Sequence, residues 1–246
     1  MIDLHTHVIP GVDDGARSWE EALAMCRMAW EDGTRILVAT PHRFNGVYDH
    51  DTDHIESQLL ELRKRLQEEQ IELEVLQGGE LYSRPDLPTL LAEDPALSLN
   101  GTKRYFLLEF PHSILPPGAP QLIFQLALKN FIPIIVHPER NLYLQRKPEL
   151  VEDFVRQGAL CQITAMSVTG EFGVKPAECA EELLKRNCVH AVASDTHNIK
   201  GRPPVLSKAY QEVSRRFGAD RARDLFELFP KKILKGETIT YVNSAS

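Results

Sequence analysis

Two histidines two positions apart, His5 and His7, lie within the first seven residues, MIDLHTH. Because side chains alternate along a β-strand, residues at this spacing point to the same face. Paired imidazoles are common ligands of zinc, manganese and iron. The start of the chain therefore raises the question of which other potential ligands the fold brings beside these two.

Further imidazoles and carboxylates follow strand-like segments, in the motifs TPH, GGE, LLEF, VHPER and SDTH. These motifs contain His42, Glu80, Glu109, His137, Asp195 and His197, together with Arg140. Six of the seven predicted strand ends carry His, Asp or Glu. The exception, ALCQITA, offers only the polar residues Gln162 and Thr164.

The elements that must position these residues alternate between strand and helix along the whole chain. The predicted strands are 2–7, 35–40, 71–79, 104–110, 132–137, 159–165 and 189–194. The predicted helices are 18–33, 54–70, 119–130, 148–158, 176–187, 204–218 and 219–229. Ser18 and Glu21 form a capping-box pattern at the first helix, and Gly33 ends it. Short apolar strands between amphipathic helices predict an α/β fold with a parallel sheet covered on both faces.

Seven such units indicate a closed or nearly closed barrel in one domain, residues 1–246, with a doubly wound open sheet as the alternative. In both folds the carboxyl ends of the strands gather at one edge. Carboxylates and imidazoles brought together there would repel or lie desolvated unless cations joined them. The candidate ligands exceed the needs of one ion, so a cluster of two or three divalent ions with a bridging carboxylate is expected.

Three other groups of histidines have blander interpretations. His190, at the start of a predicted strand, is expected to be a core residue. His50 and His54 are expected in a solvated loop and helix start, and His112 receives no role.

Composition excludes several classes of function. The 246 residues carry a net charge of −7 without a long basic run, which argues against nucleic acid as a partner. No apolar run approaches the ~20 residues that span a bilayer, and the first residues lack the pattern of a signal peptide. The four cysteines show no paired spacing, which favours a reducing, cytoplasmic location.

Cysteine-dependent, nucleotide-binding and serine-hydrolase mechanisms find no support. A cysteine phosphatase needs an arginine six positions after the cysteine, but Asp32, Ser167, Lys185 and Ser194 occupy those positions. The chain also lacks a G-x-x-x-x-G-K-[ST] loop and a G-x-S-x-G elbow. The cysteines are therefore expected to be core or helix-face residues.

The order His-x-His, TPH, Glu, Glu, HPER and SDTH resembles the polymerase and histidinol phosphatase (PHP) family of metal-dependent phosphoesterases. Within that family, MIDLHTHVIPGVDDGARS, HPERN and SDTHNIKGRPP are similar to the bacterial protein-tyrosine phosphatases encoded with capsule and exopolysaccharide export machinery. The resemblance implies a distorted (β/α)7 barrel, similar to a TIM barrel, with three divalent ions, manganese first and iron or zinc as alternatives.

The resemblance also implies the ligand sets. His5, His7, Glu80 and Asp195 would hold one ion, Glu80, Glu109 and His137 the second, and Asp14, His42 and His197 the third. Arg140 and Arg202 would bind phosphate. From the residues alone, the adjacent aspartates before Gly15 favour a turn leading to Ser18 over a ligand, and Arg202 is compatible with an ordinary surface charge.

The activity implied is hydrolysis of phosphotyrosine by a metal-bound hydroxide, on a protein such as an autophosphorylated bacterial tyrosine kinase. A small-molecule phosphatase, for example one acting on histidinol phosphate, and a non-catalytic regulator are the alternatives. Asp3, on the same strand face as the histidines, is expected to accept a hydrogen bond from an imidazole N–H. The tail TITYVNSAS is expected to form an edge strand or to be disordered.

Overall fold

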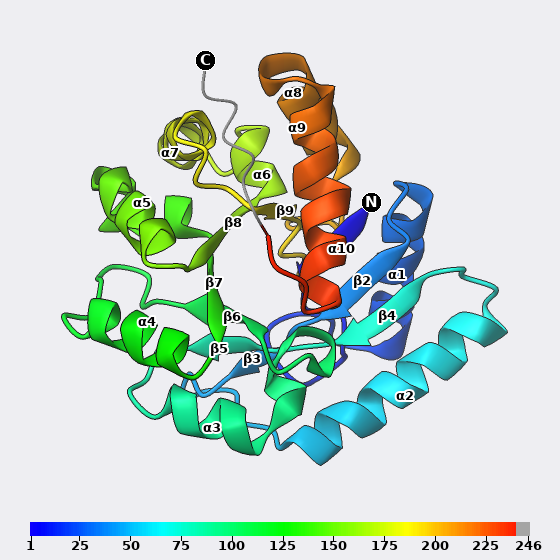
Figure 1. Cartoon of the computed structure of the whole chain (residues 1–246). Helices are drawn as coiled ribbons and strands as arrows, with labels where there is room; N and C mark the ends of the chain where they lie inside the picture. The colour runs from blue at the N-terminus through cyan, green and yellow to red at the C-terminus, as the bar shows by residue number, and fades with distance from the viewer. Residues whose placement is uncertain (240–246) are drawn as a thin grey trace.

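The computed structural model describes residues 1–239 and contains parallel strands surrounded by helices (Figure 1). The strands are β1 (Ile2–Thr6), β2 (Ile36–Ala39), β3 (His42–Arg43), β4 (Glu74–Gln77), β5 (Glu80–Tyr82), β6 (Tyr105–Glu109), β7 (Ile132–Val136), β8 (Leu160–Thr164) and β9 (Ala191–Ala193). They pair in the orders β1-β2-β4 and β3-β5-β6-β7-β8-β9. The predicted α/β class with parallel strands is confirmed.

Two of the predicted strands differ from the structure, because each is followed by a break and a further short strand. Pro41, which has no N–H to donate, separates β2 from β3, and Gly78–Gly79 separate β4 from β5. Hydrogen bonds continue across both breaks, since Gly78 N–H donates to Ala39 O (3.0 Å) and Glu80 N–H donates to Pro41 O (3.0 Å). The breaks place His42 and Glu80 in short strands of their own, opposite each other.

The first strand also pairs with the last. Asp195 N–H donates to His5 O (2.9 Å), and His7 N–H donates to Thr196 O (3.0 Å). A parallel bridge joins Thr6 to Thr196. β1 therefore lies between β2 and β9, and each of the seven predicted strands, counted with its short continuation, has a neighbour on both sides.

Helices cover the outside of the strands. They are α1 (Trp19–Glu31), α2 (Thr52–Glu68), α3 (Leu87–Glu93), α4 (Ala119–Leu128), α5 (Pro148–Arg156), α6 (Ala165–Val168), α7 (Val174–Lys185), α8 (Ser207–Phe217), α9 (Ala219–Arg223) and α10 (Phe229–Leu234). Ser18 caps α1 as predicted, although the Glu21 carboxylate accepts from Arg17 N–H rather than from Ser18. The short helices α3 and α6 were not predicted. A π-helical turn, Asp224–Leu228, joins α9 to α10, so the last helical region extends beyond residue 229.

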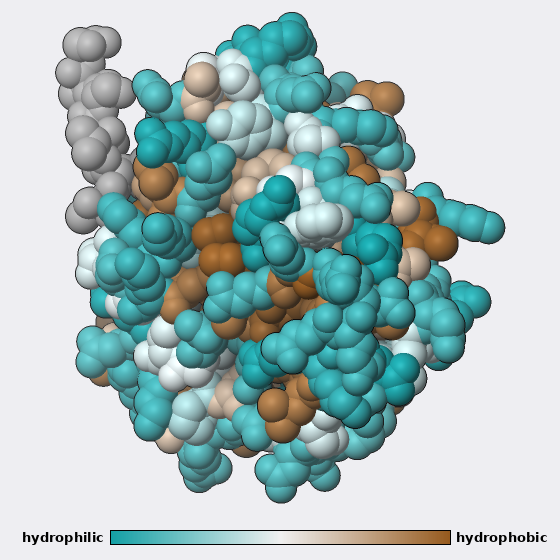
Figure 2. Space-filling model, turned by 90° about the vertical axis from the view of Figure 1, so that its right-hand side faces the viewer, coloured by the Kyte–Doolittle hydropathy of each residue, from teal (hydrophilic) through white to brown (hydrophobic). Residues whose placement is uncertain are grey.

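Hydrophobic side chains fill the space among the strands at the end opposite the candidate ligands. Leu4, Tyr105 and Leu107 lie in one buried cluster with Ile233 and Leu234 of α10, which covers that end. Figure 2 views the side where α1 and α2 lie, and it shows hydrophilic side chains over most of this face with a central hydrophobic area between them. Polar side chains buried among the strands lie mainly at the end opposite α10, which is the carboxyl end of the strands.

Three further sequence predictions concern membrane spans, the cysteines and the C-terminal tail. Among residues 1–239, no helix is long and apolar enough to cross a membrane. All four cysteines are buried, as predicted, and burial raises the pKa of Cys26 to about 12. Residues 240–246 of the C-terminal tail lie outside the described residues, so its predicted edge strand and the one-domain prediction for 1–246 stay predictions.

His190 is a core residue, as predicted. Its Nδ1 accepts the Cys161 N–H (3.2 Å) and only 3% of the residue is exposed. Burial, assisted by the nearby Arg221, lowers its pKa to about 3. The folded chain therefore keeps this imidazole neutral at pH values where the unfolded chain protonates it.

Replacing His190 by Gln should remove an acid-sensitive contribution to stability. Below a pH of ~6.5, His190 is protonated in the unfolded wild-type chain but stays neutral in the folded one. As the pH falls, the free energy of unfolding of the wild type should therefore decrease by up to ~1.4 kcal/mol per pH unit relative to that of His190→Gln. The difference should level off as the pH nears about 3. Urea unfolding followed by circular dichroism across this range checks the prediction, and parallel pH curves for the two proteins would contradict it.

Candidate metal centre

The structure brings all nine sequence-predicted ligands together at the carboxyl ends of the strands. His5 lies at the end of β1 and His7 directly after it, and β9 is followed by Asp195 and His197. His42 begins β3, Glu80 begins β5, Glu109 ends β6 and His137 follows β7, whereas Asp14 lies in the loop between β1 and α1. Four overlapping groups have ligand atoms within 4.8 Å of one another: His7, Asp14, His42 and His197; His5, His7 and Glu80; His5, His137 and Asp195; His42, Glu80 and Glu109.

Glu80 is the centre of the cluster. Its Oε2 lies 2.9 Å from His42 Nδ1, 3.2 Å from His5 Nε2 and 3.3 Å from His7 Nε2. Its Oε1 lies 2.8 Å from His137 Nε2. The residue is 1% exposed, and Oε2 accepts no hydrogen bond within the described residues. A buried carboxylate oxygen with imidazole nitrogens on several sides suits a divalent cation, because the ligand types and the negative charge both match.

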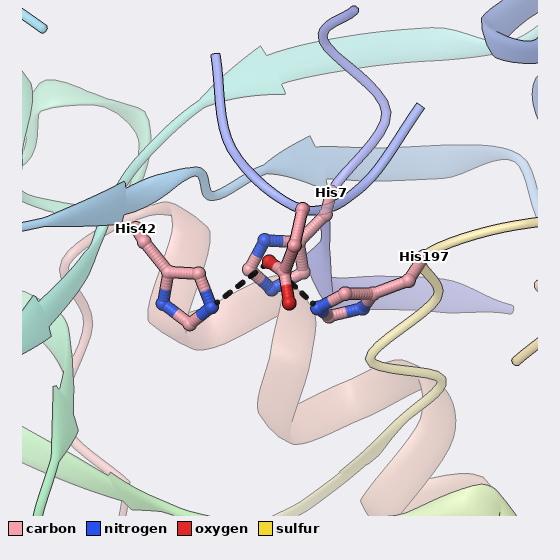
Figure 3. A group of neighbouring side chains, drawn as sticks. His7, His42 and His197 are labelled. Atoms are coloured by element: carbon pink, nitrogen blue, oxygen red, sulfur yellow. Dashed lines mark ion pairs between the residues drawn. The ribbon is translucent and has the colours of Figure 1, made fainter. Parts of the chain in front are cut away.

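Asp14 forms the outer part of the cluster, together with His42, His7 and His197. Figure 3 shows these three histidines converging, with dashed lines marking the ion pairs that His42 and His197 make. In both pairs the nitrogen is Nε2 and it lies 3.3 Å from Asp14 Oδ1. The Asp14 side chain is 48% exposed, so this part of the cluster faces the entrance.

Asp195 links the imidazoles to the two predicted phosphate-binding arginines. Its Oδ1 lies 3.3 Å from His5 Nε2 and 3.4 Å from His7 Nε2. Its Oδ2 accepts hydrogen bonds from both Arg140 and Arg202. Two guanidinium groups therefore converge on the edge of the cluster, where an anionic substrate would gain from their N–H donors.

The ionisation of these groups is set by their burial and mutual contacts. Burial, reinforced by the nearby Glu80 carboxylate, raises the pKa of Glu109 to about 8. Burial alone would lower the pKa of His42, but contacts with Asp14 and Glu80 outweigh it and raise that pKa to about 10. A proton on His42 thus offsets part of the carboxylate charge in this arrangement. A divalent cation would take over that role and displace protons, so metal affinity should weaken at low pH.

The hydrogen-bond partners that orient the first two histidines differ from the sequence prediction. His7 Nδ1 contacts Asp13 Oδ2 (2.7 Å), and His5 Nδ1 contacts Gln162 Oε1 (2.9 Å). The prediction that Asp3 pairs with an imidazole is wrong: its Oδ1 lies within hydrogen-bond range of the backbone N–H groups of Ser194 (3.0 Å) and His5 (3.4 Å). Asp3 lies two residues before His5 in β1, deeper in the sheet, so its carboxylate does not reach the rings.

Two signals in the sequence were available for these partners. Asp13 is the first of two adjacent aspartates, and its carboxylate also accepts Gly15 N–H (2.9 Å), as in a turn. The turn and the ligand hypotheses for this segment are therefore compatible, because the two aspartates point in different directions. Gln162 is a polar residue in an otherwise apolar strand, which indicates a buried partner.

Glu139 is a further buried carboxylate that the sequence analysis missed. It is 0% exposed and lies in the short 3₁₀ turn Pro138–Arg140. Its Oε1 accepts from Thr164 N–H (2.9 Å), Thr164 Oγ1 (2.6 Å) and Ser167 Oγ (2.8 Å). These bonds tie the turn that carries His137 and Arg140 to the end of β8.

One cavity of about 180 Å³ opens onto the cluster. Both arginines line it, as do Glu80, Asp195 and His112. His112 therefore lies at the entrance, whereas His50 and His54 stack on each other, 5.0 Å between ring centroids, and belong to none of the four ligand groups.

The fold is parallel α/β, and imidazoles, carboxylates and arginines surround one cavity at the strand ends, which are the features of a candidate metal-centre protein. β-Aspartyl dipeptidase from Fervidobacterium islandicum shares this fold at 11% identity, with a TM-score of 0.59 over 97% of this chain and 74% of that one. The chain belongs to the CpsB/CapC family of capsular polysaccharide synthesis, whose profile matches residues 1–235.

Two relatives are similar over nearly their whole length. Tyrosine-protein phosphatase YwqE from Bacillus subtilis is 39% identical over 97% of this chain and 93% of its own. Tyrosine-protein phosphatase CpsB from Streptococcus agalactiae is 32% identical over 97% of this chain and 100% of its own. A crystal structure from a study of YwqE and of CpsB from Streptococcus pneumoniae, described as unique metal-dependent tyrosine phosphatases, has a TM-score of 0.92 at 38% identity, covering 98% of this chain and 96% of that chain.

Replacing Gly15 by Ala should disrupt the metal centre without replacing any of the proposed ligands. A Cβ at this position would lie 2.1 Å from His7 O and 2.5 Å from His7 Cβ, so the turn carrying Asp13 and Asp14 must move. We expect manganese affinity to fall at least ~10-fold, the lower end of what loss of a ligand-orienting partner costs. Calorimetric titration checks this. Gly118→Ala is the matched control, since a Cβ there meets nothing within 4 Å; equal affinities would contradict the prediction.

Proposed function

We propose that this chain is a metal-dependent protein-tyrosine phosphatase that acts in capsule or exopolysaccharide synthesis. The observation that carries the proposal is one cavity lined by both the His/carboxylate cluster and two arginines. A phosphate monoester needs its charge neutralised from several sides, and metal ions with guanidinium groups can do this. The names of the relatives YwqE and CpsB support the choice of phosphotyrosine as substrate.

The nine clustered residues are the proposed metal ligands, and together they would bind three ions. The four overlapping ligand groups support more than one ion. Four residues each belong to two of the groups: His5, His7, His42 and Glu80. Manganese is our first choice and iron or zinc are alternatives, since imidazole and carboxylate ligands suit all of them. When bound, such ions neutralise phosphate charge and activate water for attack on phosphorus.

Arg140 and Arg202 are the proposed phosphate-binding residues. Each contacts Asp195 through one nitrogen, which leaves other donors of each guanidinium for phosphate oxygens. Arg202 Nε has no hydrogen-bond partner among residues 1–239. Arg140 also packs over the Phe172 ring, with 4.7 Å between its Cζ and the ring centroid. Asp195 and Phe172 thus orient the two side chains before substrate arrives.

Tyrosine is a favourable leaving group for this site. Phenol has a pKa of about 10, so a phenolate departs more readily than an alkoxide and needs less help from a general acid. The substrate we infer is the autophosphorylated form of a bacterial tyrosine kinase, which this chain would meet in the cytoplasm. The family is described as one of capsular polysaccharide synthesis, and this supports the choice of partner.

The direct test compares two substrates. Manganese-loaded protein should release phosphate from a phosphotyrosine peptide much faster than from histidinol phosphate, and chelation or His7→Ala should abolish the release. Preference for histidinol phosphate would favour a small-molecule phosphatase. Activity on neither substrate, with bound metal confirmed by elemental analysis, would overturn the enzyme proposal, and activity that survives both chelation and His7→Ala would overturn the metal mechanism.

Arg140→Lys should separate phosphate binding from metal binding. Lysine keeps the charge but loses the planar fork that holds two phosphate oxygens. We expect kcat/KM for a phosphotyrosine peptide to fall about 10- to 100-fold, the effect of losing one charge-assisted hydrogen bond of ~1.5–3 kcal/mol. Metal content should stay the same, and Lys147→Arg, on an exposed side chain that does not line the cavity, serves as control. Unchanged kinetics for Arg140→Lys would remove this residue from the proposed site.

A further inference from the structure

A second cavity, of about 290 Å³, lies directly beside the catalytic cavity. Phe110, the residue after β6, lines both of them. The second cavity lies against the first turns of α4, which packs outside β7 and next to α3 (Figure 1). We call it the α4 cavity; its other lining residues include Pro116, Gly118, Leu122 and Gln125.

The wall between the two cavities is fixed by hydrogen bonds. Asn141 lines the catalytic cavity, and its Nδ2 donates to Pro111 O (2.7 Å) and Ile114 O (3.2 Å). Leu142 N–H donates to His112 O (2.9 Å). The segment 111–118 is therefore held at a set distance from the metal centre, although it has no regular secondary structure of its own.

The lining of the α4 cavity is suited to an apolar side chain and not to an anion or a cation. Ala119 and Leu122 form its base, and no acidic residue lines it. Its one charged residue, Arg84, already makes a two-point ion pair with Asp86. Outside the cavity lining, Ile114 of the 111–118 segment and Phe124 of α4 expose 56% and 62% of their surface. Gln121 and Gln125 add exposed amides that can bond to a peptide backbone.

We propose that the α4 cavity binds an apolar side chain that neighbours phosphotyrosine in the substrate polypeptide. The inference rests on the proposed function and deepens it, because it makes the segment around the phosphotyrosine a determinant of specificity. A polypeptide whose phosphotyrosine occupies the catalytic cavity must pass over the rim, and each residue advances the chain by only ~3.3–3.6 Å. A cavity separated from the catalytic one by a single phenylalanine lies within reach of the nearest residues.

The first experiment measures kcat/KM on phosphotyrosine peptides that differ at one flanking position. In an alanine background, leucine is placed at each position near the phosphotyrosine in turn, and free phosphotyrosine is the reference substrate. Leucine at one of these positions should raise kcat/KM about 10-fold or more, as expected for burying one such side chain. Equal rates at all positions would overturn the inference.

Filling the cavity should remove that preference. Gly118→Trp places a large side chain at a position where a Cβ meets nothing within 4 Å and the backbone φ is −83°. Gln125→Trp does so from an exposed helix position, as a second variant in case the first fails to fold. In both, the ratio of kcat/KM for the leucine peptide to that for free phosphotyrosine should fall about 10-fold. Leu128→Trp, at a 69% exposed position of α4 outside the cavity, should keep the wild-type ratio.

The outcomes separate this inference from the function on which it depends. If the wild-type protein hydrolyses neither the phosphotyrosine peptides nor free phosphotyrosine, the proposed function fails. If it hydrolyses the peptides and both cavity variants keep the peptide preference, only the α4 cavity inference fails. A change of oligomeric state in Gly118→Trp and Gln125→Trp, seen by light scattering without a change in the kinetic ratio, would assign the cavity to a second copy of the chain and overturn the inference.

Discussion

The contact of one buried carboxylate, Glu80, with four imidazoles from the β1, β3 and β7 segments is the interaction on which the arrangement of the site depends. Each of these nitrogens lies within 3.3 Å of a Glu80 oxygen. A carboxylate without such partners would not stay ionised in a space from which water is excluded. The contacts hold the pKa of Glu80 well below its usual range, with burial opposing and the imidazoles of His5 and His137 prevailing. Glu80 therefore stays ionised, as a ligand of a cation must be.

The strand pairing makes that contact possible. β1 has neighbours on both sides, so His5 and His7 meet groups from β3 and β5 on one side and from the end of β9 on the other. The break at Gly78–Gly79 starts the chain again at Glu80, directly opposite His42. The backbone at His137 and Asp195 adopts left-handed φ values of 36° and 52°, which turn these side chains to the cluster immediately after their strands. Such conformations are uncommon in residues other than glycine, although Asp and His adopt them more readily than most, and they cluster at functional sites.

The sequence predicted the residues at the strand ends better than it predicted their partners. A motif such as HPER follows an apolar run directly, so the strand period alone places His137 near the edge of the sheet. The partners Asp13, Gln162 and Glu139 depend on which loop crosses which strand, and a single sequence does not contain that information. Asp3 shows the limit most clearly: it lies on the same strand face as the histidines, yet the neighbouring backbone N–H groups take up its carboxylate. The strand breaks at Pro41 and Gly78 were missed because the apolar pattern continues up to them.

The two cavities differ in chemistry because different parts of the fold build them. The catalytic cavity is formed by strand ends, whose positions are fixed by backbone pairing, and its chemistry changes little unless the strands change. The α4 cavity is formed by the 111–118 segment and one helix, where residues can vary without disturbing the pairing. Asn141 connects the two, since one amide group lines the catalytic cavity and holds the segment in place. A fold of this kind can keep one reaction constant while the recognition of the surrounding polypeptide adapts to its partner.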